Sequence, residues 1–483
     1  MNSKLVQMRK IFFYLFLLML TESSAQATYQ SLLLYNVSIV NVRDGTIRRN
    51  TAVGLEGNKI KAIGAYNDLK SSVAVTNQVD CKGQFLIPGL WDMHVHLEGA
   101  ELVEDNKALL PVFLAYGITT VRDCASDLGE KVLAWRKEIR DGLLAGPNLF
   151  TAGRKLEGKN SIWKGDLEIE NTTELRQMLD LLDGYKVDFV KITENTLGGD
   201  LFLQSVKEAH ARGYRVSGHV PIDVTIQQLS DAGYTSVEHS SYLLRLGSDE
   251  NAITGDLKSG KITRAEADAR YTSTFDQARA VKGYKALGKA GLFVCPTMIG
   301  GRELAYLDVT DHSHDVPLSF LTEKYVANYQ WRIQRMAGDT PLQKQQRKER
   351  YNLLRKQLPL LQQSGITLMA GSDAAALNTY VYPAESLIQE VEIFQESGMT
   401  PLQILQAATL NGARYFGITN QTGAIDPGKD ADLVLLADNP LEDIRAVRKV
   451  QAVVTHGKFY DRKAIDGLLE AARETKRRLD SGR

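Results

Sequence analysis

The chain has 483 residues, with 58 basic and 58 acidic side chains, and 43% of its residues are hydrophobic. The balanced charge argues against nucleic acid or an anionic membrane surface as the main partner. The length exceeds what one compact core usually holds, so we expect at least two structural units. The three cysteines, Cys81, Cys124 and Cys295, are too widely spaced for a disulfide framework or a CxxC metal site, and we interpret them as buried structural thiols.

The first 27 residues have the pattern of a signal peptide. Three basic residues within 1–10 precede an unbroken apolar run over 11–20, and small residues follow up to the Ala-Gln-Ala tripeptide that ends at Ala27. The run is shorter than the roughly 20 residues that a membrane-spanning helix needs, and Ala-x-Ala is typical of a cleavage site. We therefore expect cleavage after Ala27 and an exported protein, periplasmic or secreted, without stable membrane insertion.

Short β-like segments occur at both ends of the remaining chain. Between 31 and 87, apolar runs alternate with turn residues such as Asp44-Gly45, and a similar pattern returns over 431–455. Strands this short do not close a core alone. We therefore expect the two ends to pair into one small β-sandwich domain made of 28–87 and 421–483.

Between these ends, short apolar strands alternate with helical stretches, which indicates βα units and a parallel sheet. Eight strands are expected, over 86–96, 118–124, 148–153, 189–193, 215–220, 236–240, 292–297 and 367–373. The expected fold is therefore α/β, with a (β/α)8 TIM-like barrel over 88–420. Two connections, 241–291 and 298–366, are long, polar and helical in pattern, and we expect them to cover the catalytic face as lid and specificity elements.

Side chains suited to metal binding fall at the C-terminal ends of the expected strands. The set is His94 and His96 in strand one, Lys191 in strand four, His219 in strand five, His239 in strand six and Asp373 in strand eight. C-terminal strand ends meet at one mouth of a barrel, and residues i and i+2 of a strand share a face. Imidazole and carboxylate groups suit a divalent metal such as zinc, with a coordination position left for water. The sequence thus predicts a metal site at this mouth.

Each of these residues alone has a simpler interpretation. A single strand-end histidine is more often a hydrogen-bonded structural residue, the amine of Lys191 could reach water along the surface, and Asp373 could cap the next helix. The coincidence of all six on one rim favours the metal site. His312 and His314 repeat the His-x-His spacing in a polar stretch, and we interpret them as residues of a solvated loop.

Taken together, these motifs resemble those of the amidohydrolase superfamily over nearly all of the mature chain. Pro-Gly-Leu-Trp-Asp-Met-His-Val-His over 88–96 resembles that family's opening metal motif, and Gly-Ser-Asp over 371–373 resembles its final one. The stretch beginning at Gly423 is similar to its closing β-domain signature. Lys191 in a Val-Lys-Ile context and Thr-Thr-Val-Arg-Asp over 119–123 are similar to the exported prolidase-like branch, which shares its pattern with imidazolonepropionase-like proteins.

The resemblance implies a binuclear centre with two divalent ions, usually zinc, bridged by Lys191 carboxylated on its amine. It places His94, His96 and Asp373 on one ion. It places His219 and His239 on the other. The implied reaction is hydrolysis of an amide by a metal-bridging hydroxide, in Xaa-Pro-type dipeptides or in N-acyl amino acids, with Asp373 as general base and then general acid.

Substrate-binding residues and the bond cleaved are left more open. Arg154, Tyr242 and Arg245 follow expected strands and could hold a substrate carboxylate, since a guanidinium binds it through two parallel hydrogen bonds; ordinary loop residues are the alternative. A metal-dependent hydrolase of cyclic amides, lactones or other esters is a second hypothesis. A non-catalytic, metal-bearing binding protein is a third, and a homo-oligomer is left open. No Gly-x-Ser-x-Gly, GxGxxG or P-loop motif supports a serine hydrolase, dehydrogenase or kinase.

Overall fold

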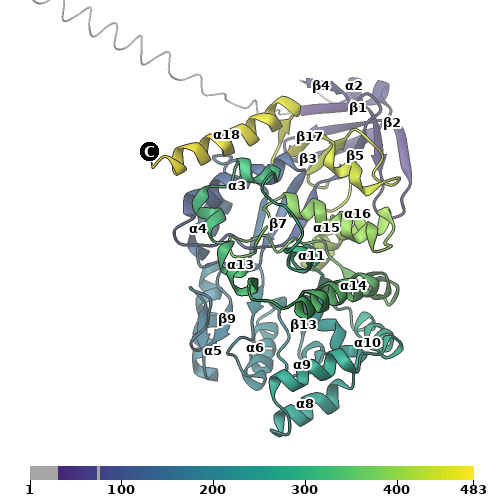
Figure 1. Ribbon diagram of the computed structural model, residues 1–483. Coiled ribbons are helices and arrows are strands. Elements are labelled where there is room, and N and C mark those ends of the chain that lie inside the picture. The colour runs from purple at the N-terminus through teal and green to yellow at the C-terminus, as the bar shows by residue number, and fades with distance from the viewer. Residues whose placement is uncertain (1–30, 73–76, 483) are drawn as a thin grey trace, which may run out of the picture.

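The computed structural model describes residues 31–72 and 77–482, and the expected signal peptide over 1–27 lies outside the described residues. The two ends of this described chain share one eight-stranded sheet, in which strands from the first 60 residues lie beside strands from the last 60 (Figure 1). Its strands are β1 (Ser31–Val40), β2 (Ile47–Glu56), β3 (Lys59–Gly64), β4 (Asn77–Asp80), β5 (Phe85–Pro88), β16 (Leu433–Leu436), β17 (Val450–Thr455) and β18 (Lys458–Tyr460). The ends meet where β16 runs antiparallel to β5, with Leu435 opposite Leu86.

Eight parallel strands form the barrel, and each overlaps one of the eight expected segments. They are β6 (Leu90–Val95), β7 (Ile118–Asp123), β8 (Asn148–Thr151), β11 (Val190–Ile192), β12 (Val216–Gly218), β13 (Tyr234–Glu238), β14 (Phe293–Cys295) and β15 (Thr367–Leu368). The strands β6 to β8 pair in one run, and β11 to β15 pair in another. The runs are joined by hydrogen bonds from the Asp188 amide to the Thr151 carbonyl (3.0 Å) and from the Asp373 amide to the His94 carbonyl (2.7 Å). The expected α/β barrel fold is confirmed.

The first expected strand differs from the structure because the chain changes sheet at Gly89. The strand β5 before it belongs to the terminal sheet, whereas β6 after it belongs to the barrel. The Gly89 amide donates to the Asp432 carbonyl (2.8 Å), and a Cβ on this residue would lie 1.9 Å from Oγ1 of Thr119. Only glycine leaves room for this crossing, which fixes the terminal sheet against the base of β6.

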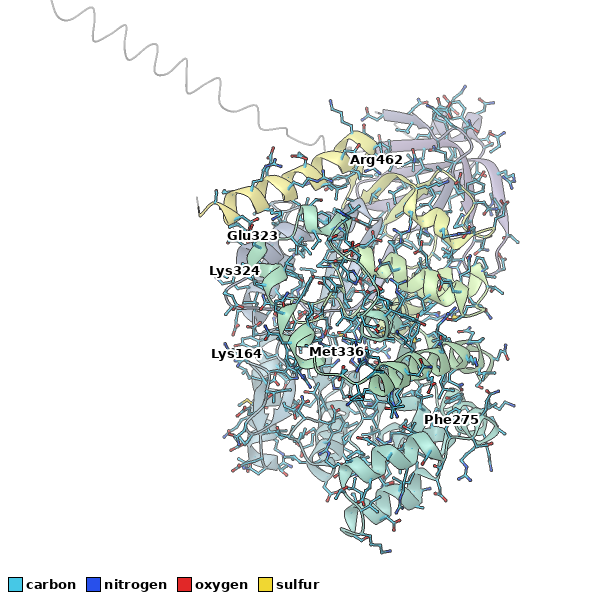
Figure 2. All side chains as sticks on the ribbon, in the orientation of Figure 1. Lys164, Phe275, Glu323, Lys324, Met336 and Arg462 are labelled. Atoms are coloured by element: carbon cyan, nitrogen blue, oxygen red, sulfur yellow. The ribbon has the colours of Figure 1, made fainter. Side chains whose placement is uncertain are left out.

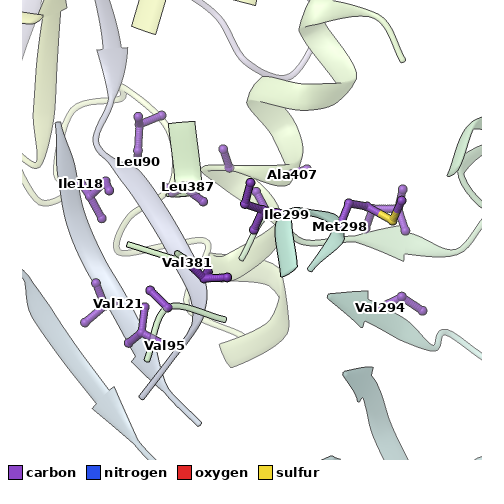
Figure 3. Packing of buried hydrophobic residues seen from close by; sticks show 14 of the residues in the cluster. Leu90, Val95, Ile118, Val121, Val294, Met298, Ile299, Val381, Leu387 and Ala407 are labelled. Carbon is purple, nitrogen blue, oxygen red and sulfur yellow. The ribbon is translucent and has the colours of Figure 1, made fainter. Parts of the chain in front are cut away.

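The helices outside the barrel form where apolar residues recur at helical spacing. The helix α5 (Thr172–Tyr185) begins at Asn171, whose side chain accepts from the Glu174 amide, and it buries Leu175, Leu179 and Leu182 on one face. Figure 3 shows part of the buried core, where Leu90 of β6 lies beside Ile118 of β7 and Val95 of β6 lies beside Val121 of β7. The barrel strands are therefore held rigidly, with their C-terminal ends pointing to one mouth.

Both long connections are helical, as expected. The first contains α8 (Glu250–Lys258), α9 (Arg264–Ser273) and α10 (Gln277–Lys289); the second contains α11 (Met298–Tyr306), α12 (Glu323–Ala327), α13 (Gln330–Met336) and α14 (Pro341–Gln363). The start of α12, with Glu323 and Lys324 labelled in Figure 2, lies beside the C-terminal helix α18 (Arg462–Asp480), because the Glu323 amide donates to Asp480 (2.9 Å). None of the helices within 31–72 and 77–482 combines the length and apolar character needed to cross a bilayer.

The expectation that His312 lies in a solvated loop is wrong. Its side chain is buried, its ring stacks on Tyr380 with centroids 3.8 Å apart, and its Nδ1 lies 2.8 Å from a carboxylate oxygen of Asp315. His314 two residues later is exposed, as expected. The polar sequence around His312 gave no sign of this packing, because its partner Tyr380 lies nearly 70 residues away in the chain.

Two short strands were not expected. They are β9 (Leu156–Gly158) and β10 (Leu167–Ile169), which pair in parallel, and β9 also pairs with β11 through Leu156 and Ile192. The loop between β9 and β10 carries Trp163, which lines the cavity at the mouth of the barrel. This small extension therefore brings an aromatic side chain to the site described next.

Candidate metal centre

The structure brings all six predicted residues to one place at the mouth of the barrel. Nε2 of His94 lies 3.2 Å from Nε2 of His96, and both nitrogens lie 3.3 Å from Oδ1 of Asp373. Nε2 of His219 lies 3.2 Å from Nε2 of His239. Asp373 also connects the two histidine pairs, because its Oδ2 is 4.0 Å from Nδ1 of His239. The residues thus form two adjacent clusters of nitrogen ligands around a shared carboxylate.

The Nδ1 atom of each of the four histidines is held by an acceptor, which fixes its tautomer. His96 Nδ1 donates to the Ala125 carbonyl (2.8 Å), a group that can only accept. His239 Nδ1 lies 2.6 Å from the hydroxyl of Thr297, whose own proton goes to the Pro296 carbonyl (2.8 Å). In the neutral form of these rings the proton is therefore on Nδ1, and the lone pair of Nε2 faces the site.

The other two histidines are oriented by buried carboxylates. His94 Nδ1 donates to Glu238 (2.9 Å), and His219 Nδ1 donates to Glu194 (2.8 Å). Glu238 is itself clamped by Arg122, whose Nη2 lies 2.8 and 2.7 Å from its two oxygens, and both side chains are fully buried. Burial raises the pKa of Glu238, but Arg122 and the bond from His94 outweigh it and hold that pKa well below its usual range. The carboxylate therefore stays ionised and fixes the ring of His94.

The pKa values of three ligand candidates, His94, His239 and Asp373, favour the forms that bind cations. Burial, with the nearby charge of Lys191, lowers the pKa of His94 to about 3. Burial also lowers the pKa of His239 well below its usual value. Burial opposes ionisation of Asp373, but the surrounding imidazoles hold its pKa well below the ordinary range. Burial lowers the pKa of His96, but the hydrogen bond to Asp373 outweighs it and raises that pKa. His94 and His239 therefore favour the neutral imidazole, and Asp373 favours the ionised carboxylate.

Backbone strain is concentrated at the same rim. His239 and Asp373 adopt positive φ angles of 71° and 61°, and their neighbours Thr297 and Ala125 have φ of 49° and 107°. Such conformations are unfavourable for residues with a side chain and persist where the surrounding structure enforces them. Asp92 helps to hold the strained backbone at Asp373. Its carboxylate accepts hydrogen bonds from the amide and the hydroxyl of the preceding residue, Ser372 (2.9 and 2.6 Å).

Lys191 is the residue that protein contacts alone do not explain. Its side chain is 1% exposed, and its Nζ has no hydrogen-bond partner among the described residues. A buried ammonium without a partner is costly, and the pKa values of two nearby imidazoles, His94 and His239, are lowered. The donor set fits bound divalent cations, because nitrogen and carboxylate ligands of this kind hold zinc and similar ions. Ligand atoms of His94, His239 and Asp373 also lie within 4.8 Å of one another, close enough to share one ion.

Three neighbouring cavities that share lining residues lie at this site. An inner cavity of about 110 Å³ is lined by Lys191, Asp373 and three of the histidines. It shares Lys155 and Trp163 with an outer cavity of about 700 Å³, whose rim includes Lys164 (labelled in Figure 2). It shares Arg332 with a side cavity of about 290 Å³. The metal candidates therefore lie at the bottom of a chamber large enough for a small molecule.

The three residues expected to hold a substrate carboxylate do not line this inner cavity. The guanidinium of Arg154 donates to the Gly165 carbonyl. Arg245 is buried, donates to the Pro221 carbonyl (2.8 Å) and pairs with Glu250 (2.9 Å). Tyr242 donates to Glu194 (2.7 Å), so it supports the carboxylate that orients His219. The structure thus places all three residues outside the inner cavity and in contact with protein groups, and their role in substrate binding stays a prediction.

Other residues that line the chamber or support the histidines were missed. They are Glu98, Lys155, Trp163, Glu194, Glu238, Thr297, Trp331 and Arg332. Glu194 and Glu238 had a usable signal, since each is adjacent in sequence to a strand end or to a predicted ligand. Arg332 and Trp331 had none, because they come from α13 within a connection whose path over the barrel is set by tertiary packing.

Comparisons with known proteins agree with this architecture. The model of the Amidohydrolase family matches residues 85–460. Ochratoxinase from Aspergillus niger is 24% identical over 432 residues, covering 86% of this chain and 82% of that protein. A solved Xaa-Pro dipeptidase with methionine bound in its active site has a TM-score of 0.65 at 18% identity, covering 89% of this chain and 100% of that one. Bottromycin amidohydrolase has a TM-score of 0.69 at 18% identity, covering 92% and 91%.

Proposed function

Because the chain belongs to the Amidohydrolase family and is a hydrolase, we propose that it cleaves amide bonds in dipeptides or N-acyl amino acids with the help of two divalent ions. The observation that carries the proposal is the common orientation of four imidazoles. Each Nδ1 is engaged by a protein acceptor, and the Nε2 atoms face each other in two pairs, His94 with His96 and His219 with His239. Facing lone pairs repel one another, and a bound cation removes that repulsion.

The proposed ligand sets follow the distances within the site. His94, His96 and Asp373 would hold one ion, since their ligand atoms lie 3.2 to 3.3 Å apart. His219 and His239 would hold the second. Zinc suits these donors, and the metal identity is part of the proposal.

Lys191 would complete both ligand sets after carboxylation of its amine. The neutral amine attacks carbon dioxide, a carbon–nitrogen bond forms, and one proton is released, which leaves a carbamate anion on Nζ. An ammonium has only donors and cannot bind a cation, whereas a carbamate has two oxygens that can. The buried and unpartnered Nζ supports this modification, because the carbamate replaces an isolated positive charge by a negative one among cations.

When bound, the divalent ions supply a water of lowered pKa and polarise the carbonyl of the amide. Asp373 then acts as the proton carrier: its carboxylate accepts a proton at Oδ1 or Oδ2 and returns it to the departing amine nitrogen. Its φ of 61° and the hydrogen bond from its amide to the His94 carbonyl hold it over the site. Its low pKa keeps it ready to accept.

The substrate is proposed to be a small molecule or a short peptide that reaches the site in an exported protein. The neighbouring cavities support a small substrate, and the pattern over 1–27 supports export. A lactone or other ester places its carbonyl in the same position. A substrate panel that contains matched amides and esters therefore decides between the two classes of bond.

The test uses the purified mature chain. We expect close to two equivalents of divalent metal per chain and release of amino acids from some members of a dipeptide and N-acyl amino acid library. Asp373→Asn should lose turnover of every substrate, whereas Arg154→Met serves as a matched control outside the inner cavity. Two equivalents of metal with hydrolysis of esters or lactones only would replace the amide proposal, and the absence of metal from active enzyme would end it.

A further inference from the structure

The helix α13 places two large side chains in the chamber above the metal candidates. Trp331 lines the outer cavity, and Arg332 lines both the inner and the side cavity. Trp331 lies 6.1 Å from Trp163 of the β9–β10 loop, with the rings at 80° to each other. The chamber therefore has an aromatic wall made by two segments far apart in the sequence, and a guanidinium beside it.

The guanidinium of Arg332 is only partly satisfied by the protein. Its Nη2 donates to Oδ1 of Asn378 (2.6 Å), while its Nε is buried and has no hydrogen-bond partner among the described residues. Within the same described part of the chain, no carboxylate forms an ion pair with it, in contrast to Arg122, Arg245 and Arg448. A buried cationic donor without an acceptor costs free energy, and an anionic ligand would remove that cost.

The position of Arg332 is tied to the reactive carboxylate. Asn378, which accepts from Arg332, donates from its Nδ2 to the backbone carbonyl of Asp373 (2.7 Å). Arg332 and Asp373 line the same inner cavity. An anion on the free side of Arg332 would therefore lie close to the bond that is hydrolysed, rather than at the far end of the substrate.

From this geometry we propose that Arg332 binds a carboxylate of the substrate next to the cleaved amide, while Trp163 and Trp331 contact an aromatic or large apolar group in the outer cavity. This proposal rests on the proposed function and names its substrate class: amides that carry a carboxylate near the cleaved bond and a bulky apolar group. Arg335, which stacks over Trp331 at 4.5 Å, faces the outer cavity and has no place in the inner one. It therefore serves as the matched control on the same helix.

The test measures binding without turnover, so that it stands apart from the amide hydrolysis itself. The metal-loaded enzyme is titrated by calorimetry with 3-phenylpropanoate and with 4-phenylbutan-2-one, an uncharged molecule of the same shape that has no hydrolysable bond. We expect the carboxylate to bind about 10-fold more tightly, as befits a charge-assisted hydrogen bond. Arg332→Met should reduce that preference to within about 2-fold and leave binding of the ketone unchanged.

Two further variants keep the test decisive. Arg332→Lys keeps the positive charge but loses the planar guanidinium with its paired donors. It should therefore retain only part of the preference for the carboxylate. Arg335→Met should keep the full preference for the carboxylate over the ketone. A preference that survives intact in Arg332→Met, in protein with an unchanged melting temperature, would overturn the proposal and assign the carboxylate to the metal centre instead. Binding through Arg332 in an enzyme that cleaves no amide would keep the carboxylate site at Arg332 and remove the proposed function, together with the amide substrate class that rests on it.

Discussion

The rim of the barrel and the chamber above it are built in different ways. The rim is made of strand ends, and its side chains are fixed by buried partners, as His94 is by Glu238. The chamber wall is made of connections, and its polar groups are incompletely paired, as Arg332 and Trp331 are. The difference indicates that the strands fix the reacting groups, whereas the connections select the substrate.

The largest effect that this comparison predicts is at Asp373. Replacement by Asn keeps the shape but removes the carboxylate that carries the proton, so we expect kcat to fall about 10²- to 10⁴-fold with little change in KM. Steady-state kinetics on the best substrate from the library measures this. An equal loss of kcat for Trp331→Ala, which changes only the chamber wall, would break the distinction between rim and wall.

The next effect concerns the buried pair beneath the rim. Glu238→Gln leaves Arg122 without a charged partner at a position with no solvent access, so we expect a loss of about 3–5 kcal/mol in the free energy of unfolding. Urea unfolding of the metal-free protein measures this loss. Without bound ions, the free energy of unfolding contains no contribution from metal binding. Arg445→Met, at an exposed ion pair, should leave the unfolding midpoint unchanged. A stability loss at Glu238 no larger than that of Arg445 would contradict the account of a rigid rim.

A smaller effect is expected at the chamber wall. Trp331→Ala removes one face of the aromatic wall, so KM for substrates with an aromatic group should rise about 5- to 10-fold, while kcat changes less than about 2-fold. A pair of substrates that differ only in benzyl against methyl at the apolar group checks this. A fall in kcat with unchanged KM would place Trp331 with the rim residues and weaken the comparison.

The smallest effect is expected at Arg154, whose guanidinium contacts a backbone carbonyl outside the inner cavity. Arg154→Met should change kcat/KM less than about 2-fold for any substrate with a carboxylate, because the residue does not line the inner cavity and its Nε donates to the Gly165 carbonyl. The same kinetic assay gives the value. A large rise in KM would restore Arg154 as a substrate ligand.

Much of the rim could be predicted from the sequence because strands have a fixed period and parallel strands end together. His94 and His96 share a face for that reason, and Lys191 stands out as a charge inside an apolar strand. The break of the first strand at Gly89 could not be predicted, since it depends on contact with Thr119 in the next strand. The places of Arg332 and of the buried His312 could not be predicted for a similar reason. Both depend on how a 69-residue connection packs onto distant segments.

The central claim is that six side chains hold two cations at the mouth of the barrel, and anomalous diffraction at the absorption edge of the bound metal tests it most directly. We expect two peaks, one next to His94, His96 and Asp373 and one next to His219 and His239, with density for a carboxylated Lys191 between them. Crystals of active enzyme with no anomalous peak at this rim, or with the amine of Lys191 unmodified and no cation beside it, would contradict the account.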